Sequence, residues 1–123
     1  VCANRNKTCD NGPMQINDGW FDGRWGVDLE KDFGVSKDSV VNNECVNLMV
    51  GMWRLRSEYE GLKNWYEAVA AYNAGPKNRA AGYEYANRVF RWYARIKKHE
   101  IQGREKGLVV TPKKRELVSI TGA

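Results

Sequence analysis

Two short clusters in the sequence combine a side-chain amide with neighbouring apolar and aromatic residues. Residues 12–17 read Gly-Pro-Met-Gln-Ile-Asn, and residues 70–76 read Ala-Ala-Tyr-Asn-Ala-Gly-Pro. A side-chain amide both donates and accepts hydrogen bonds, so Gln15 and Asn73 suit a ligand that is rich in hydroxyl and N-acetyl groups. Tyr72 adds the apolar face of its ring and a hydroxyl beside Asn73.

A purely structural interpretation of the two clusters is also open. In it, Gln15 and Asn73 hydrogen-bond to the backbone, while Met14 and Tyr72 fill the core. For one cluster alone this is the commoner outcome. Two clusters in the same kind of turn, each at a helix end, favour a binding site.

The elements that must position these residues are expected to be mainly α-helical. Apolar residues at a 3,4,3,4 spacing predict a central helix whose inward face consists of Cys45, Leu48, Met52, Leu55 and Tyr59. Asn43 is its expected N-cap, and Gly61 its expected stop. A second helix is expected from Asn64, with Gly75 and Pro76 ending it.

A third helix is expected over about residues 83–98, with an inward face made of Ala86, Val89, Phe90, Tyr93 and Ile96. The first 35 residues are expected to form a loop packed by Trp20, Phe21 and Trp25, with a short helix beginning near residues 14–17. The organisation predicted is one domain over residues 1–103, followed by a tail or a small β-hairpin over residues 104–123.

Composition excludes several classes of protein. The chain has 123 residues, of which 42% are hydrophobic and 28% charged, which is typical of one globular domain rather than a disordered chain. No apolar run reaches the roughly 18 residues of a membrane span. Three cysteines and the lone His99 show no ligand spacing, so neither a metal nor a cofactor is expected. A disulfide in an exported protein, with one cysteine left over, is the preferred interpretation.

The charge is distributed unevenly. Residues 1–61 carry a net charge of −3 and residues 62–123 one of +8. A basic half suggests an anionic partner, namely a nucleic acid, a membrane surface or an acidic polymer. The other interpretation is that Arg88, Arg91, Arg95, Lys97 and Lys98 form the solvated face of one helix.

Taken together and in order, the motifs resemble the soluble lytic transglycosylase family, which has the goose-type lysozyme fold. The resemblance rests on the two clusters and on Tyr85-x-x-Arg88-Val89 with Tyr93, and it covers roughly residues 4–97. It is closest to the small transglycosylases that accompany bacterial secretion and conjugation systems. Those share an Asn-Arg pair and an Asp before the first cluster, and a cysteine at the start of the central helix; the matching residues here are Asn4, Arg5, Asp10 and Cys45.

The resemblance implies cleavage of the β-1,4 bond between N-acetylmuramic acid and N-acetylglucosamine in peptidoglycan, with a 1,6-anhydro product. A buried glutamic acid protonates the glycosidic oxygen and later takes the proton of the muramic 6-hydroxyl, and the substrate's N-acetyl group stabilises the cationic carbon. By motif match, Gln15 and Asn73 would bind the sugars, and Met14 and Tyr72 would line the groove. Tyr85 would hold the acid in place.

The resemblance also implies the partners and the location of the protein. Peptidoglycan glycan strands are the expected ligand, and a secretion or conjugation apparatus is a candidate partner. The expected location is periplasmic or extracellular, and no cofactor is implied.

One departure from the family pattern concerns the acid itself. In the family the acid belongs to a Glu-Ser pair on a helix that precedes the Met-Gln-Ile element, whereas here no glutamate precedes Glu30. We expect that the helix with the acid, together with a cysteine partner for Cys45, lies upstream of Val1 and that this chain alone is inactive. A rearranged domain, or another carboxylate as the acid, are the alternatives. Four acidic residues are candidates for that substitute, and none is persuasive: Asp10, Asp18, Glu44 and Glu67.

Two functions of other classes remain open. A non-catalytic module could bind peptidoglycan or chitin oligomers in the same groove without an acid. A nucleic-acid-binding module is suggested by the isoelectric point of about 9.2 and the five tryptophans. The tryptophans fall among loop glycines or on helix faces, which a core explains better, so no nucleic-acid partner is expected.

Overall fold

The computed structural model describes residues 1–105, and most of them are helical. The elements are two strands, two 3-10 helices and five α-helices: β1 (Asp10–Asn11), β2 (Ile16–Asn17), η1 (Asp18–Phe21), α1 (Leu29–Phe33), α2 (Lys37–Asn42), α3 (Glu44–Leu62), α4 (Trp65–Ala74), η2 (Pro76–Gly82) and α5 (Tyr83–Glu105). The predicted mainly-α class is therefore confirmed. The hairpin or tail expected over residues 104–123 lies almost entirely outside the described residues, which end at residue 105.

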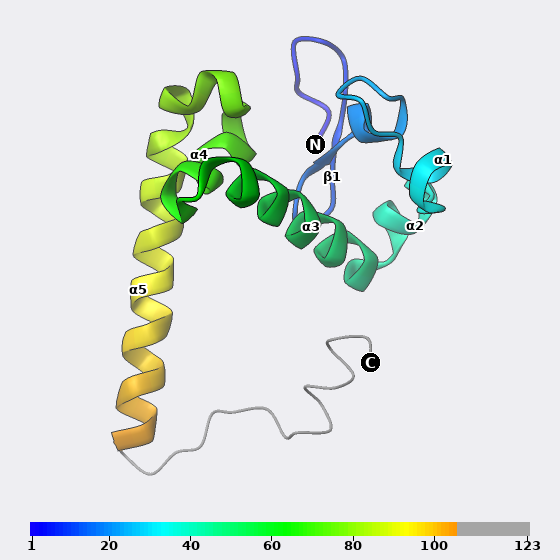
Figure 1. Cartoon of the computed structure of the whole chain (residues 1–123). Coiled ribbons are helices and arrows are strands. Elements are labelled where there is room, and N and C mark those ends of the chain that lie inside the picture. Colours follow the sequence, from blue (N-terminus) through cyan, green and yellow to red (C-terminus); the bar gives the residue numbers. More distant parts are fainter. Residues whose placement is uncertain (106–123) are drawn as a thin grey trace.

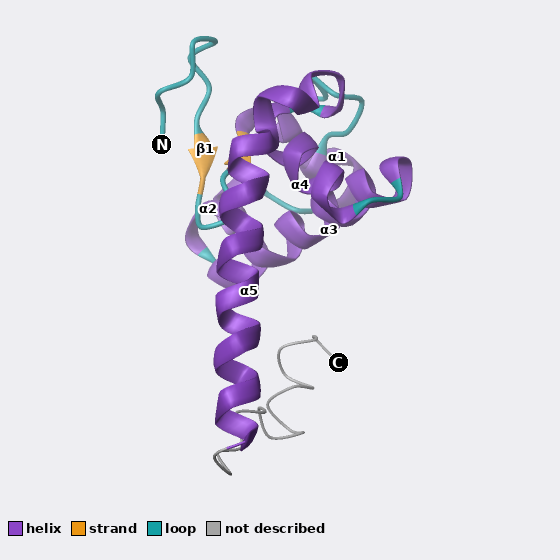
Figure 2. Ribbon diagram, turned by 90° about the vertical axis from the view of Figure 1, so that its left-hand side faces the viewer, coloured by secondary structure: helices purple, strands orange, loops and turns teal. Residues whose placement is uncertain are grey.

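Helix α3 runs across the middle of the molecule, as Figure 1 shows. The β-strands, α1 and α2 lie toward its beginning, and α4, η2 and the start of α5 lie toward its end. Helix α4 packs against α3, η2 and α5. Helix α5 then extends well beyond the other elements (Figures 1 and 2).

A two-stranded antiparallel ladder replaces the short helix expected near residues 14–17. Asp10 pairs with Asn17, and Asn11 pairs with Ile16. The turn between the strands uses positive φ angles at Gly12 and Gln15, which a helix start could not accommodate. The sequence prediction was wrong here because these strands are too short to show an alternating pattern.

One disulfide closes the N-terminal loop. It joins Cys2 to Cys9, and Cys45 is an exposed free thiol. One disulfide with one cysteine left over agrees with the sequence expectation. A partner for Cys45 outside this chain stays a prediction.

In the part of the chain that the structure describes, the apolar interior contains two small clusters. The first contains Ile16, Leu29, Val40 and Val50, with Trp20 and Phe21 among the partly buried residues around it. The second contains Val69, Ala70 and Ala86 where α4 meets α5. Gly82 is required there, because a Cβ at this position would collide with the carbonyl oxygen of Ala70.

The helix caps largely follow the prediction. Asn43 and Asn64 cap α3 and α4 by accepting hydrogen bonds from Val46 and Glu67 backbone N–H groups, and Gly75 ends α4. The stop of α3 was misplaced. The helix continues past Gly61 and is capped by Lys63 in the left-handed conformation.

The predicted inward face of α3 is correct only in part, because Leu55 packs against the second cluster and Tyr59 is half-buried. Cys45, Leu48 and Met52 are exposed, whereas Asn47, Val50 and Gly51 are buried. The helix is rotated because its opposite side packs against the β1–β2 turn. Helix periodicity located the helix correctly, but its most apolar stripe was not the buried one.

The predicted inward face of α5 is correct only near the start of the helix. Ala86 is buried and Val89 packs against the second cluster. Phe90 is 37% exposed, Tyr93 56% and Ile96 63%. The Phe90 ring still lies 5.8 Å from that of Tyr66 in α4, whereas Tyr93 and Ile96 come later in α5, the helix that extends well beyond the other elements (Figure 2).

Among residues 1–105, none of the helices has the length and hydropathy that crossing a membrane requires.

Candidate functional site

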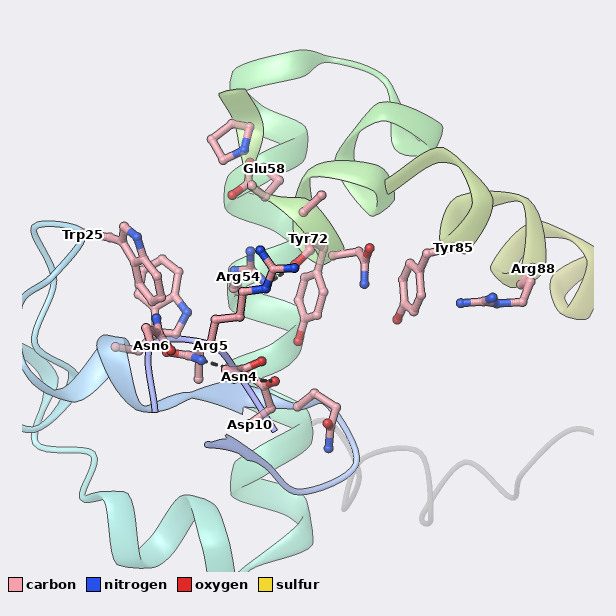
Figure 3. Close-up of a pocket in the computed structure, with 17 residues that line it drawn as sticks. Asn4, Arg5, Asn6, Asp10, Trp25, Arg54, Glu58, Tyr72, Tyr85 and Arg88 are labelled. Carbon is pink, nitrogen blue, oxygen red and sulfur yellow. Dashed lines mark hydrogen bonds between the residues drawn. The ribbon is translucent and has the colours of Figure 1, made fainter. Parts of the chain in front are cut away.

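Strands β1 and β2 with their turn form a short hairpin, which is called the hairpin below. A groove of about 970 Å³ lies between this hairpin, α3, the end of α4 and the start of α5. Figure 3 shows the side chains that line it. Amides, aromatic rings and charged groups all contribute to its wall: Asn4, Arg5, Asn6, Asp10, Gln15, Asn17, Trp20, Trp25, Arg54, Glu58, Tyr72, Asn73, Ala74, Gly75, Pro76, Tyr85 and Arg88. Such a mixture suits a ligand with both ring faces and hydroxyl or amide groups.

The first predicted cluster is held in place by Asn47 of α3. The Asn47 side chain is fully buried, accepts a hydrogen bond from the Met14 N–H at 2.8 Å and donates to the Asn11 carbonyl at 2.9 Å and the Val40 carbonyl at 3.1 Å. Gly12 is needed beside it, because a Cβ there would collide with the Asn47 side chain. The turn therefore presents Gln15 at the groove.

The second predicted cluster reaches the same groove from the end of α4. The Tyr72 hydroxyl donates to the Met14 carbonyl over 2.6 Å, which joins the two clusters across 58 residues of sequence. Burial raises the pKa of this hydroxyl above its ordinary value, so it remains a donor at neutral pH. Asn73 is exposed and lines the same groove as Gln15.

Met14 occupies a different position from the other predicted site residues. Its side chain lies against Gly51 of α3, where an added Cβ would come within 2.5 Å of the Met14 Cγ, and it packs on the first core cluster. It is not among the residues that line the groove. The structure thus places Met14 beneath the groove, with its carbonyl as the group that Tyr72 contacts.

Tyr85 lies on the first turns of α5 and lines the groove opposite the hairpin. Its hydroxyl makes no hydrogen bond to any residue in the range 1–105. The Arg88 guanidinium carbon lies 5.9 Å from the centre of the Tyr85 ring. The hydroxyl is accordingly available to a further group in the groove.

Sequence reasoning missed the residue at the centre of the groove, Arg54. It comes from the polar face of α3, which continues from Asn47 through Gly51 to Glu58. Arg54 and Glu58 lie outside the inward face that apolar spacing predicts for this helix, so the sequence analysis does not include them. The spacing of Asn47, Arg54 and Glu58 along one helix face was the signal that could have found them.

The structure also adds Trp25, together with Trp20, to the residues that line the groove. The Trp25 ring centroid lies 4.9 Å from that of Trp20, and half of the Trp25 surface is exposed. It had been assigned to the packing of the loop. An exposed tryptophan in a groove offers a flat face on which a sugar ring can stack.

The carboxylates near the hairpin are occupied by hydrogen bonds. Both oxygens of Asp10 accept side-chain amides, one from Asn4 at 3.0 Å and one from Asn17 at 2.9 Å. Glu58, in contrast, makes no ion pair or hydrogen bond with any of the residues 1–105, although it lines the groove.

Asp18 holds the base of the hairpin. Its oxygens accept hydrogen bonds from the Cys9 N–H at 2.8 Å and the Asn11 amide at 2.9 Å, and Lys37 lies 2.9 Å away. Burial tends to raise the pKa of Asp18, but the hydrogen bonds and the Lys37 charge outweigh it and lower the pKa to about 2. Asp18 is therefore an ionised structural residue at neutral pH.

The remaining acidic residues considered from the sequence lie away from the groove. Glu44 is exposed at the beginning of α3. Glu67 accepts hydrogen bonds from the Tyr83 hydroxyl at 3.0 Å and pairs with Arg79 at 3.3 Å. Neither lines the groove.

The fold and the groove together define a small, mainly helical domain whose site is built from amides and aromatic rings. A family model for the transglycosylase SLT domain matches residues 3–92. The chain belongs to the transglycosylase SLT domain family, and the resemblance drawn from the sequence is confirmed.

Individual relatives support the same assignment. The chain is 28% identical over 113 residues to the invasion protein IagB of Salmonella typhi, an alignment that covers 90% of this chain and 67% of the relative. It is 31% identical over 98 residues to the protein IpgF of Shigella flexneri, with 78% of this chain and 60% of the relative covered. No solved structure gives a significant match. The chain thus spans 60% to 67% of the length of these two relatives.

Proposed function

We propose that the protein is a peptidoglycan lytic transglycosylase, which cleaves the β-1,4 bond between N-acetylmuramic acid and N-acetylglucosamine and leaves a 1,6-anhydro end. Membership of the transglycosylase family supports this activity. The single observation that carries it to this site is the hydrogen bond from the Tyr72 hydroxyl to the Met14 carbonyl. That bond brings the two motifs of the family resemblance together at one groove.

In this proposal the groove binds a glycan strand through the residues that line it. Gln15 and Asn73 offer amides to the N-acetyl and hydroxyl groups of the sugars. Trp25 and Tyr72 offer aromatic faces, and Tyr72 is held by its hydrogen bond to the hairpin. Met14 contributes from beneath, by fixing the turn that carries Gln15.

The acid/base glutamate is proposed to come from the segment of the longer protein that the family resemblance places upstream of Val1. Two features of the groove support this. Asp10 already accepts two amide hydrogen bonds, and the Tyr85 hydroxyl faces the groove without a partner among residues 1–105. Tyr85 would donate a hydrogen bond to that glutamate and hold its carboxyl group at the glycosidic oxygen.

The proposal extends to location and partners. An exported, periplasmic or extracellular protein would meet peptidoglycan and could keep the Cys2–Cys9 disulfide oxidised. The resemblance to the small transglycosylases of secretion and conjugation systems supports a secretion or conjugation apparatus as the partner that the enzyme serves.

The test is digestion of purified peptidoglycan, with the released muropeptides identified by mass spectrometry. The 123-residue chain and a longer form that includes the upstream segment are compared. We expect anhydromuramic ends from the longer form and none from the shorter one. Tyr85→Phe in the longer form should reduce the rate by about tenfold to a hundredfold, since a positioning hydrogen bond to the acid is lost.

Two other results would change the proposal. If the 123-residue chain releases anhydro products and Glu58→Gln abolishes the release, the acid is Glu58 and the upstream assignment is wrong. If neither form releases products but both bind glycan oligomers, the protein is a non-catalytic binding module. This second candidate is favoured by the groove being lined with amide and aromatic side chains whether or not an acid is present.

A further inference from the structure

Arg54 of α3 contacts two other segments of the molecule at the centre of the groove, as Figure 3 shows. Its Nη1 donates a hydrogen bond to the Tyr72 carbonyl at 2.6 Å, and its Nη2 donates to the Ala71 carbonyl at 3.4 Å. The guanidinium carbon lies 4.2 Å from the centre of the Tyr72 ring and 5.5 Å from that of the Trp20 ring. The side chain therefore joins α3 to the end of α4 and to η1.

The two carbonyls that Arg54 binds lie at the C-terminal end of α4. Tyr72 lies in the last turn of α4, where carbonyl groups can lack partners within the helix, whereas the Ala71 carbonyl also accepts a hydrogen bond from the Gly75 N–H at 2.7 Å. A cation near a helix C-terminus is favoured by the helix dipole. Arg54 thus supplies both the hydrogen bonds and the charge that the end of α4 requires.

The arginine is not held there by an acidic partner. Within the part of the chain that the structure describes, Arg54 forms no salt bridge, and its Nε is buried without a hydrogen-bond partner. Burial lowers the pKa of the guanidinium below its ordinary value, yet an arginine stays protonated at neutral pH. A buried charge of this kind is retained only where its other contacts offset the loss of solvation.

Those contacts fix the orientation of Tyr72 and hence the spacing of the two sugar-binding motifs. Arg54 stacks on the Tyr72 ring and binds the Tyr72 backbone, while the hydroxyl of that same ring donates to the Met14 carbonyl. Asn73 follows Tyr72 directly, and Gln15 follows Met14 directly. Moving Arg54 would move one amide relative to the other.

We propose that Arg54 is a positioning residue, which holds the Tyr72–Asn73 turn against the Met14–Gln15 turn so that both amides are preorganised for a glycan. The identity of the ligand rests on the proposed function. The geometry requires a planar group with two donors that can also stack on an aromatic ring. Lysine carries the charge but has neither the fork of donors nor the plane.

The test compares Arg54→Met and Arg54→Lys with the control Arg56→Met in the 123-residue chain. Arg56 lies on the same helix, is exposed and, among residues 1–105, pairs with Glu60 alone, at 2.7 Å. Three quantities are measured: urea unfolding, the side-chain amide NMR shifts of Gln15 and Asn73 in the ligand-free protein, and the affinity for N-acetylglucosamine tetramers. The NMR shifts are a readout that an effect on stability alone would not change in the folded protein.

We expect both Arg54 variants to shift the Gln15 and Asn73 amide signals and to lower affinity by about tenfold, because preorganisation is lost. Arg56→Met should leave both quantities unchanged. Unmoved signals and an affinity within about twofold of the parent, in a folded Arg54→Lys or Arg54→Met variant, would overturn the proposal. If Arg54→Met does not fold, the amide shifts and the affinity of Arg54→Lys alone test the proposal.

The two proposals fail in different ways. If the unaltered protein binds no tetramer and no peptidoglycan fragment, the proposed function is wrong. The amide signals of the ligand-free protein still decide whether Arg54 positions the two turns.

Discussion

Two faces of α3 differ in composition and in environment: a largely polar face is turned toward the hairpin and the groove, and an apolar face is exposed. The face that meets the hairpin and the groove carries Asn47, Gly51, Arg54 and Glu58. The opposite face carries Cys45, Leu48, Met49 and Met52, which are exposed to the extent of 61% at Met49 and 66% at Met52. A surface helix normally buries its apolar stripe and exposes its polar one.

The difference reflects the hydrogen bonds that the inner face of α3 makes to the backbone of neighbouring segments. Its inner face binds two backbone groups of neighbouring segments, namely the turn N–H of Met14 and the carbonyl of Tyr72 in the last turn of α4. Side-chain amides and a guanidinium can satisfy such groups, whereas leucine or methionine cannot. Polar residues on this face therefore hold the segments that form the groove.

The largest expected effect comes from removing Asn47 on the inner face. Asn47→Ala leaves the Met14 N–H and the Asn11 and Val40 carbonyls without their partner. We expect a loss of about 3 kcal/mol in the free energy of unfolding, measured by urea titration. The control, Asn42→Ala, loses only hydrogen bonds to Asp38 at an exposed site. A loss below about 1 kcal/mol at position 47 would show that the inner face does not hold the hairpin.

The next effect concerns acid stability at the base of the hairpin. The folded-state pKa of Asp18 is about 2, compared with an ordinary value of 3.8. Because the pKa is lowered by folding, the contribution of Asp18 to stability is complete above pH 3.8 and is lost as the pH falls toward 2. We expect a contribution of about 2 kcal/mol at neutral pH.

The check is the free energy of unfolding between pH 2 and pH 6 for the parent protein and for Asp18→Asn. The part of the pH dependence due to Asp18 should vanish in the variant, whereas Asp22→Asn, at an exposed pair with Arg24, should retain it. Parallel curves for parent and Asp18→Asn would contradict the assignment.

A smaller effect is expected at the contact that joins the two motifs. Tyr72→Phe removes the hydrogen bond to the Met14 carbonyl but keeps the ring under Arg54. We expect a loss of about 1 kcal/mol in the free energy of unfolding and a weaker affinity for glycan oligomers. Tyr59→Phe is the matched control, since the Tyr59 ring stacks on Trp65 and its hydroxyl has no partner within residues 1–105. Equal effects at both positions would argue against a role for the Tyr72 hydroxyl.

The smallest effect is expected on the outer face of α3. Met49→Ser and Met52→Ser change exposed side chains, so the free energy of unfolding should change by less than about 0.5 kcal/mol. Val50→Ser, which alters a residue that is 7% exposed, should instead cost about 3 kcal/mol. A loss above 1 kcal/mol at Met49 or Met52 would mean that another part of the protein covers this face.

Local features of the fold could be read from the sequence. The Asn43 and Asn64 caps and the stop at Gly75 depend on side chains and conformations of the residues themselves. The two motifs were also identified, and four of the five predicted site residues line one groove: Gln15, Tyr72, Asn73 and Tyr85. Met14 was placed correctly in the turn but lies beneath the groove.

Features that depend on which elements meet could not be read in this way. The rotation of α3, the exposure of Tyr93 on α5 and the role of Arg54 all follow from the position of a neighbouring segment. Hydrophobic periodicity assumes that the most apolar face is the buried one. That assumption fails at α3, where the neighbour is a turn with unpaired backbone groups, and at α5, where the helix is longer than the neighbour.

The sequence by itself determined the helical class, the starts of the three long helices, the end of α4 and the family, because caps, breakers and motifs are properties of neighbouring residues. Only the tertiary structure decided which face of α3 is buried and that Arg54 joins Trp20 to Tyr72. These contacts join residues far apart in the chain. Their free energy depends on partners that no local pattern specifies.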